Sequence, residues 1–184
     1  MKIREEYQDI VKIKKILVHN HIPMISEDKV KNCIKNASLN QEIIWGDCYK
    51  GCKHEMEDTE SLEIQIGFKS YSPFFTFMYF YRDKINVFFK GGAGKMADGM
   101  YSATCNYYKL KDKKEKQPTI YINYHHSCNM DFLSLLRHEL LHIKYTGHCS
   151  GKDCIFNSCS IFEDTINFCK ECQNKYNEII KEII

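Results

Sequence analysis

The sequence predicts an α+β fold in which a sheet of about five strands packs against helices, and three observations support this. The chain has 184 residues, the length of about one domain, and 43% of them are hydrophobic, enough for a buried core. Apolar residues recur at helical spacing near the start of the chain and again after residue 130, whereas residues 62–68 alternate between apolar and other side chains. Five cysteines lie close together near the C-terminus, where this periodicity is lost. We therefore expect two helices, a sheet, one long helix and a small cysteine-rich end.

The first 60 residues are expected to be mainly helical. Residues 4–18 carry apolar side chains at helical spacing and predict an amphipathic helix. A second helix is expected to begin after Ser26, a residue type that favours the N-cap and is followed here by two acidic residues, and to end before Trp45. The stretch 48–60 has the composition of a loop.

The middle of the chain predicts the sheet. Alternation of Leu62, Ile64, Ile66 and Phe68 with other residues predicts a half-buried strand. Residues 111–118 have the composition of a charged turn. Four further strands are expected from aromatic and β-branched composition or from alternation, at residues 74–81, 85–89, 100–110 and 119–124.

The last third of the chain predicts a long helix and then a cysteine-rich segment. Leucines form one stripe at helical spacing within residues 130–145, and a short amphipathic helix is expected at 173–184. We expect one domain spanning the whole chain. Its N-terminal lobe, residues 1–147, would hold the sheet and the long helix, and its small C-terminal lobe would be residues 148–184.

Composition argues against two classes of partner. The chain has 26 basic and 24 acidic residues and a net charge of +2, which gives no electrostatic reason to expect nucleic acid. It contains no run of 18 apolar residues, so no membrane span is expected. The N-terminus lacks the apolar segment of a secretory signal, and we therefore expect a cytoplasmic monomer with reduced cysteines.

Cysteine content favours metal binding. Ten cysteines in a reducing compartment indicate metal ligands more than a disulfide framework. Four of them have the C-x4-C and C-x2-C spacings of a closed tetrahedral zinc site, namely Cys149, Cys154, Cys169 and Cys172. The competing interpretation is that these are buried small apolar residues. A further group, Cys48, Cys52 and His54, lacks a fourth ligand.

The long predicted helix carries the motif H-E-x-x-H, formed by His138, Glu139 and His142. Residues four apart lie on one helical face, so both imidazoles are able to bind one zinc ion. Glu139 is rotated by about 100° from His138, which leaves its carboxylate free to act as a general base on water. His148 is the expected third ligand, because a chain that turns at Gly147 returns it to the same ion. The competing interpretation is two solvated histidines on an ordinary helix.

These residues resemble the signature of the archaemetzincin family of zinc metallopeptidases, H-E-x-x-H-x-x-G-x-x-H-C-x4-C-x-M followed by C-x-x-C, over residues 138–172. The resemblance implies a metzincin-like mixed twisted sheet and two zinc ions. The catalytic ion would bind His138, His142 and His148 with Glu139 as the base, and the structural ion would bind Cys149, Cys154, Cys169 and Cys172. Gly92, Ala93 and Ser102 are similar to the family's lead into an edge strand, along which substrate is expected to lie.

Two positions depart from that signature. Tyr145 stands where the family has glycine, and Phe156 stands where it has methionine. A bulky residue adopts a left-handed turn reluctantly, so we expect the helix to run slightly longer and to break at Gly147, with His148 still reaching the ion. Phe156 is expected to supply an apolar floor beneath the ion.

The sequence thus predicts a compact zinc metallopeptidase that acts on a peptide or protein substrate. One alternative keeps the chemistry but completes the site with Glu163, His125 or His126 in place of His148. Another is a catalytically inactive, zinc-stabilised interaction module, suggested by the missing glycine and methionine. Glu139 argues against this second alternative, because a structural zinc site does not need that carboxylate.

Overall fold

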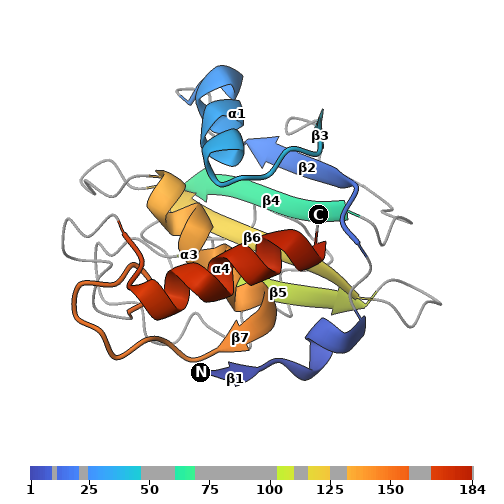
Figure 1. Ribbon diagram of the computed structural model, residues 1–184. Coiled ribbons are helices and arrows are strands. Elements are labelled where there is room, and N and C mark those ends of the chain that lie inside the picture. Colours follow the sequence, from blue (N-terminus) through green and yellow to red (C-terminus); the bar gives the residue numbers. More distant parts are fainter. Residues whose placement is uncertain are drawn as a thin grey trace.

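The computed structural model describes residues 1–9, 12–20, 25–46, 61–68, 103–109, 116–124, 132–157 and 167–183. They form a mixed α+β arrangement (Figure 1). In chain order the elements are β1 (Lys2–Ile3), the 3-10 helix η1 (Glu5–Asp9), β2 (Lys15–Asn20), α1 (Glu27–Asn36), β3 (Glu42–Trp45), β4 (Ser61–Phe68), β5 (Ala103–Lys109), β6 (Lys116–Tyr124), α3 (Phe132–Lys144), β7 (Tyr145–Thr146) and α4 (Lys170–Ile183).

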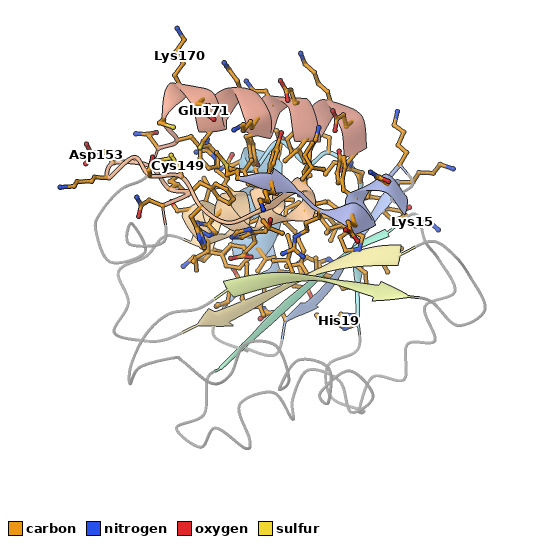
Figure 2. All side chains as sticks on the ribbon, turned by 90° about the horizontal axis from the view of Figure 1, so that it is seen from below. Lys15, His19, Cys149, Asp153, Lys170 and Glu171 are labelled. Carbon is orange, nitrogen blue, oxygen red and sulfur yellow. The ribbon has the colours of Figure 1, made fainter. Side chains whose placement is uncertain are left out.

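The larger sheet has the strand order β3-β2-β4-β6-β5. Strands β3, β2, β4 and β6 run parallel, whereas β5 runs antiparallel to β6 at one edge. Strands β1 and β7 form a separate antiparallel pair. Helices α1, α3 and α4 lie on the same side of the larger sheet, and α3 lies between the sheet and α4 (Figure 1, Figure 2). Helix α3 is therefore enclosed by neighbours on two sides.

The core fills the space between the sheet and these helices. Val18, Ile64 and Ile120 lie side by side on three adjacent parallel strands, and all three are fully buried. Burying such side chains is the main favourable term in folding. The helices contribute further buried side chains to the same core, among them Val30, Ile34, Leu136, Leu140 and Ile179.

The helix expected over residues 4–18 is wrong. Residues 5–9 form η1, and residues 15–20 form β2. Strand β2 lies inside the sheet between two parallel neighbours, and its four central residues, Ile16 to His19, are all buried. A strand that is buried on both faces carries a continuous apolar run, and such a run also satisfies helical spacing.

The helix expected after Ser26 is confirmed as α1. The Ser26 hydroxyl accepts a hydrogen bond from the backbone N–H of Lys29 at 3.3 Å, as an N-cap residue does. The helix ends at Asn36, earlier than the expected end before Trp45, and the chain then turns through Ser38, whose φ is 62°. The sequence did not predict β3, which follows this turn and pairs with β2.

Several other expected elements are present with shifted ends. The strand expected at residues 62–68 is confirmed as β4, and the last two expected strands correspond to β5 and β6. Strand β6 begins at Lys116, so the expected turn at 111–118 is wrong in its last part, where Pro118 lies opposite Tyr107. The terminal helix begins at Lys170. The loop at 48–60 and the strands at 74–81 and 85–89 were expected in segments outside the described residues.

None of the helices within the described ranges is long and apolar enough to cross a membrane.

Candidate metal centre

Helix α3 carries the first three candidate residues on the side that faces the interior. His138 and His142 are one helical turn apart, and both rings contact the ring of Phe156, with centroid distances of 5.1 and 4.7 Å. His138 and Glu139 are both buried. Burying polar side chains costs free energy unless they bind hydrogen-bond partners or a metal ion. Buried histidine and glutamate side chains on one helix therefore indicate a candidate site.

Three imidazoles converge on one point. The Nε2 atom of His142 lies 3.2 Å from Nε2 of His138 and 3.3 Å from Nε2 of His148. Nitrogen ligands at about 2.0–2.1 Å from a tetrahedral zinc ion are separated by about 3.3 Å. Both separations from His142 therefore match a zinc site, and the ligand nitrogens of all three residues lie within 4.8 Å of one another.

Backbone carbonyls fix the orientation of two of these rings. Nδ1 of His138 lies 2.7 Å from the carbonyl oxygen of Ile155, and Nδ1 of His142 lies 3.1 Å from that of Tyr145. A carbonyl oxygen only accepts, so each Nδ1 must carry the hydrogen. In a neutral ring this leaves the Nε2 lone pair directed at the common point, which is the arrangement of a metal-binding histidine.

Burial favours the neutral form of all three rings at neutral pH. Burial lowers the pKa of His138 to about 4 and that of His142 to about 3, and burial also lowers the pKa of His148. Two neutral rings then direct lone pairs at each other across 3.2 Å, which is repulsive unless a cation lies between them. The geometry thus fits a bound metal ion.

The chain leaves α3 in a way that differs from the expectation. The helix ends at Lys144, so the prediction that it runs longer is wrong. Tyr145 and Thr146 instead form β7, because β1 pairs with them. Gly147 takes a φ of 72°, which confirms the predicted turn at this residue, and Tyr145 has no positive φ. This exit places His148 beside His142 without backbone strain at Tyr145.

Phe156 forms an apolar surface against all three rings. Its ring centroid lies 5.1 Å from His138, 4.7 Å from His142 and 5.6 Å from His148. Phe156 is fully buried, so it also keeps water away from that side of the cluster. Phe156 therefore lies where the sequence predicted an apolar floor for the metal site.

Glu139 lies at the edge of the same cluster. Its Oε1 atom is 3.9 Å from Nε2 of His138, and only 3% of the residue is exposed. Its Oε2 atom is buried and has no hydrogen-bond partner among the described residues. Burial raises the pKa of Glu139 to about 8, while the nearby charge of Arg4 opposes this rise. A carboxyl group with a strongly shifted pKa beside three potential metal ligands is typical of a functional site.

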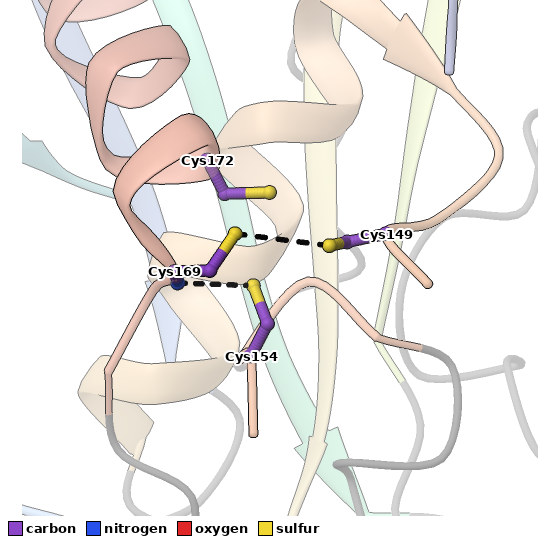
Figure 3. Close-up of side chains that lie close together, drawn as sticks. All are labelled: Cys149, Cys154, Cys169 and Cys172. Atoms are coloured by element: carbon purple, nitrogen blue, oxygen red, sulfur yellow. Dashed lines mark hydrogen bonds between the residues drawn. The ribbon is translucent and has the colours of Figure 1, made fainter. Parts of the chain in front are cut away.

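The four cysteines form a second cluster (Figure 3). Their sulfur atoms all lie within 4.8 Å of one another, and the Sγ atoms of Cys149 and Cys169 are 3.8 Å apart. Sulfur ligands at about 2.3 Å from a tetrahedral zinc ion are separated by about 3.8 Å. Backbone N–H groups point at two of the sulfurs: Gly151 donates to Cys149 and Cys169 donates to Cys154, each at 3.3 Å. Such bonds stabilise thiolates, which are the form that binds metal.

A short loop joins the two clusters. The backbone N–H of Cys149 donates to the carbonyl of Phe156 at 2.9 Å, which closes the loop between them. His148 directly precedes this loop, and Cys154 directly precedes Ile155, whose carbonyl holds His138. The cysteine cluster therefore fixes a loop that also supplies the surroundings of the histidines.

The remaining candidates lie outside the described residues: Glu163, His125 and His126 as rival ligands, Cys48, Cys52 and His54 as a third cluster, and Gly92, Ala93 and Ser102 as substrate contacts.

Sequence reasoning missed the carbonyls of Ile155 and Tyr145 and the charge of Arg4. The two carbonyls leave no signal in the sequence because every residue has a backbone carbonyl. Arg4 was missed because it lies 134 positions before His138, and the β1–β7 pairing brings its charge near Glu139.

No protein-family model matches the chain, and a search of curated proteins finds no match. The geometry of the two clusters is therefore the basis for a functional proposal.

The clusters predict the metal content of the purified protein. After removal of metal and reconstitution with zinc, we expect two zinc ions per chain by elemental analysis, because two separate ligand sets are present. A mild chelator is expected to remove one ion first, since four thiolates retain zinc more tightly than three histidines with an open position. One ion or none after reconstitution would contradict the two-site arrangement.

Proposed function

We propose that this protein is a zinc-dependent metallopeptidase of the archaemetzincin type. His138, His142 and His148 would hold the catalytic zinc ion, and the four cysteines would hold a structural one. The observation that carries the proposal is the convergence of three imidazoles beside a buried glutamate, with Nε2 of His142 at zinc-ligand spacing from Nε2 of both other rings. A purely structural site would need a fourth ligand and no free carboxylate, whereas a catalytic zinc site has three protein ligands and an open position.

The residues of the site have distinct roles in this proposal. When bound, zinc supplies a Lewis acid that polarises the scissile carbonyl and makes a water molecule more acidic. A zinc cation bound beside Glu139 would favour its ionised form and so oppose the effect of burial on its pKa. The carboxylate would then accept the proton of the attacking water at its unbonded Oε2 atom and pass it to the leaving amine. The carbonyls of Ile155 and Tyr145 keep the two helix histidines in the ligand tautomer. Phe156 excludes water from the rear of the site.

The sheet suggests where a substrate peptide would bind. Among the strands that the structure describes, β5 is the last in the order of the larger sheet, and β6 is its one neighbour there. An extended peptide binds to such an edge as an additional strand. Helix α3 packs against β5, which would bring the peptide bond to the histidines. Peptides are therefore the substrate class that we propose.

Replacement of His148 by alanine separates the three-histidine site from its rival. We expect His148→Ala to lose zinc from the catalytic site and to lower peptidase activity by at least about 100-fold, because a third ligand is removed. The cysteine zinc is expected to remain. Zinc content and cleavage of a mixed peptide library are measured on the same preparation.

The matched comparison is Glu163→Ala, which removes the rival ligand and leaves His148 in place. This variant is expected to keep both zinc ions and its activity. The reverse pattern, with His148→Ala active and Glu163→Ala inactive, would show that Glu163 completes the site. A zinc-loaded wild-type protein that cleaves no peptide would instead favour the inactive interaction module.

A further inference from the structure

The N-terminal residues pair with the chain that leaves the active-site helix. Strand β1 (Lys2–Ile3) runs antiparallel to β7 (Tyr145–Thr146). The pairing continues at Arg4, whose backbone N–H donates to the carbonyl of Lys144 at 2.8 Å. The two segments are more than 140 residues apart in sequence and lie together at the lower edge of the molecule in Figure 1. The first residues of the chain thus cover the end of α3.

Side chains of the N-terminal segment, α3 and α4 also contact one another. The Tyr7 hydroxyl donates to the carboxylate of Glu182 on α4, and Nζ of Lys144 lies 2.7 Å from the same carboxylate. The Lys144 ammonium also lies 5.1 Å from the centre of the Tyr7 ring. The N-terminal segment is therefore connected both to the end of α3 and to α4.

Strand β7 lies in the sequence between two candidate ligands, His142 and His148. The carbonyl of Tyr145 accepts from Nδ1 of His142, so its position sets the orientation of that ring. Two residues later Gly147 makes the turn that brings His148 to within 3.3 Å of His142. Any displacement of β7 would move one ring directly and the other through the chain.

Strand β7 has only two residues, and Thr146 and the following Gly147 are both exposed to solvent. Its hydrogen-bonded neighbour among the described strands is β1. The chain also lacks a glycine at position 145, which would have let the helix end in a compact left-handed turn. The extended exit seen here takes its place, and β1 supplies its hydrogen-bonding partner.

We propose that the backbone of residues 2–4 is a positioning element of the three-histidine site, which fixes β7 and thereby orients His142 and delivers His148 to the metal ion. This inference rests on the proposed metal site. It assigns the N-terminal strand a role in metal affinity. Support for a metal ligand from outside the first coordination sphere typically contributes 10- to 100-fold in affinity.

Two substitutions at one position test this role. Arg4→Pro removes the N–H that bonds to Lys144, whereas Arg4→Ala keeps that N–H and removes only the guanidinium. The guanidinium is positive, so its removal is not expected to weaken the binding of a cation. The probe is Co²⁺, titrated into protein whose cysteine site is filled with zinc, and its visible spectrum reports the histidine site.

We expect Arg4→Pro to weaken Co²⁺ binding at the histidine site by about 10-fold or more and to alter its spectrum. Arg4→Ala is expected to bind at least as tightly as the wild type. Deletion of residues 2–4 should behave as Arg4→Pro does, and the double variant Lys2→Ser with Ile3→Thr, which changes two exposed side chains and keeps the backbone, should behave as the wild type.

Three other results would be informative. Equal Co²⁺ affinity in all variants would overturn the proposal and show that the loop at Cys149 alone delivers His148. Loss of zinc from the cysteine site in both Arg4→Pro and the deletion would also overturn it, because the segment would then support the whole fold. Failure of the wild type to bind Co²⁺ beside the cysteine zinc would refute the metal site itself, and so the proposed function.

Discussion

Replacement of Cys172 by serine is expected to cause a large loss of stability. Cys172 lies in the first turn of α4, is fully buried, and faces the other three sulfurs (Figure 3). Zinc binding in small thiolate sites contributes about 10–16 kcal/mol to folding, and three remaining ligands retain part of it. We expect a loss on the order of 5 kcal/mol, which lowers the melting temperature by about 10–20 °C in a chain of this size.

The same substitution is expected to weaken the histidine site, which it does not touch. The loop between Cys149 and Cys154 leads into Ile155 and Phe156, which bond His138 and pack on all three rings. Once zinc no longer fixes that loop, these contacts loosen. We expect Co²⁺ affinity at the histidine site to fall by about 10-fold or more, measured below the melting temperature of the variant.

Cys33→Ser provides the matched control for both effects. Cys33 is a half-buried cysteine on α1, outside both ligand clusters. Its replacement is expected to change stability by about 1 kcal/mol and to leave two zinc ions per chain. If Cys172→Ser melted like the wild type and kept two zinc ions, the four sulfurs would not form a structural zinc site.

The fold was predictable where local sequence determines structure. Helix α1 follows from the N-cap at Ser26, and β4 follows from strict alternation over residues 62–68, because each pattern is satisfied by one kind of element. Strand β2 was not predictable in this way, since burial on both faces erases alternation. The β1–β7 pairing was invisible because two-residue strands carry no periodicity and their partners are far apart in the chain.

In the candidate site, too, the features set by local sequence were predictable and those set by distant contacts were not. The proximity of His138 and His142 follows from the fixed geometry of a helix, and the grouping of the cysteines was predicted from their spacing. The orientation of the rings depends on the carbonyls of Ile155 and Tyr145, which belong to tertiary structure. The helix end at Lys144 likewise depends on β1, so reasoning from Tyr145 alone placed the end too late.

Replacement of Glu139 by glutamine is expected to lower peptide turnover by a factor on the order of 100 or more. The amide has nearly the same size as the carboxylate but does not accept the proton of the attacking water. Removing a buried carboxyl group that has no hydrogen bond at Oε2 is also expected to leave the fold intact, so zinc content and melting temperature should be close to those of the wild type. Single-turnover cleavage of a fluorogenic peptide gives the rate.

Glu178→Gln is the matched control, because it makes the same chemical change at an exposed position on α4, outside both clusters. It is expected to retain wild-type turnover and zinc content. Together the two variants separate loss of the base from a general effect of removing one negative charge. A Glu139→Gln variant with two zinc ions and undiminished cleavage would show that another group takes the proton. Loss of turnover together with loss of zinc would show that Glu139 supports the ligands, and the general-base role would then be wrong.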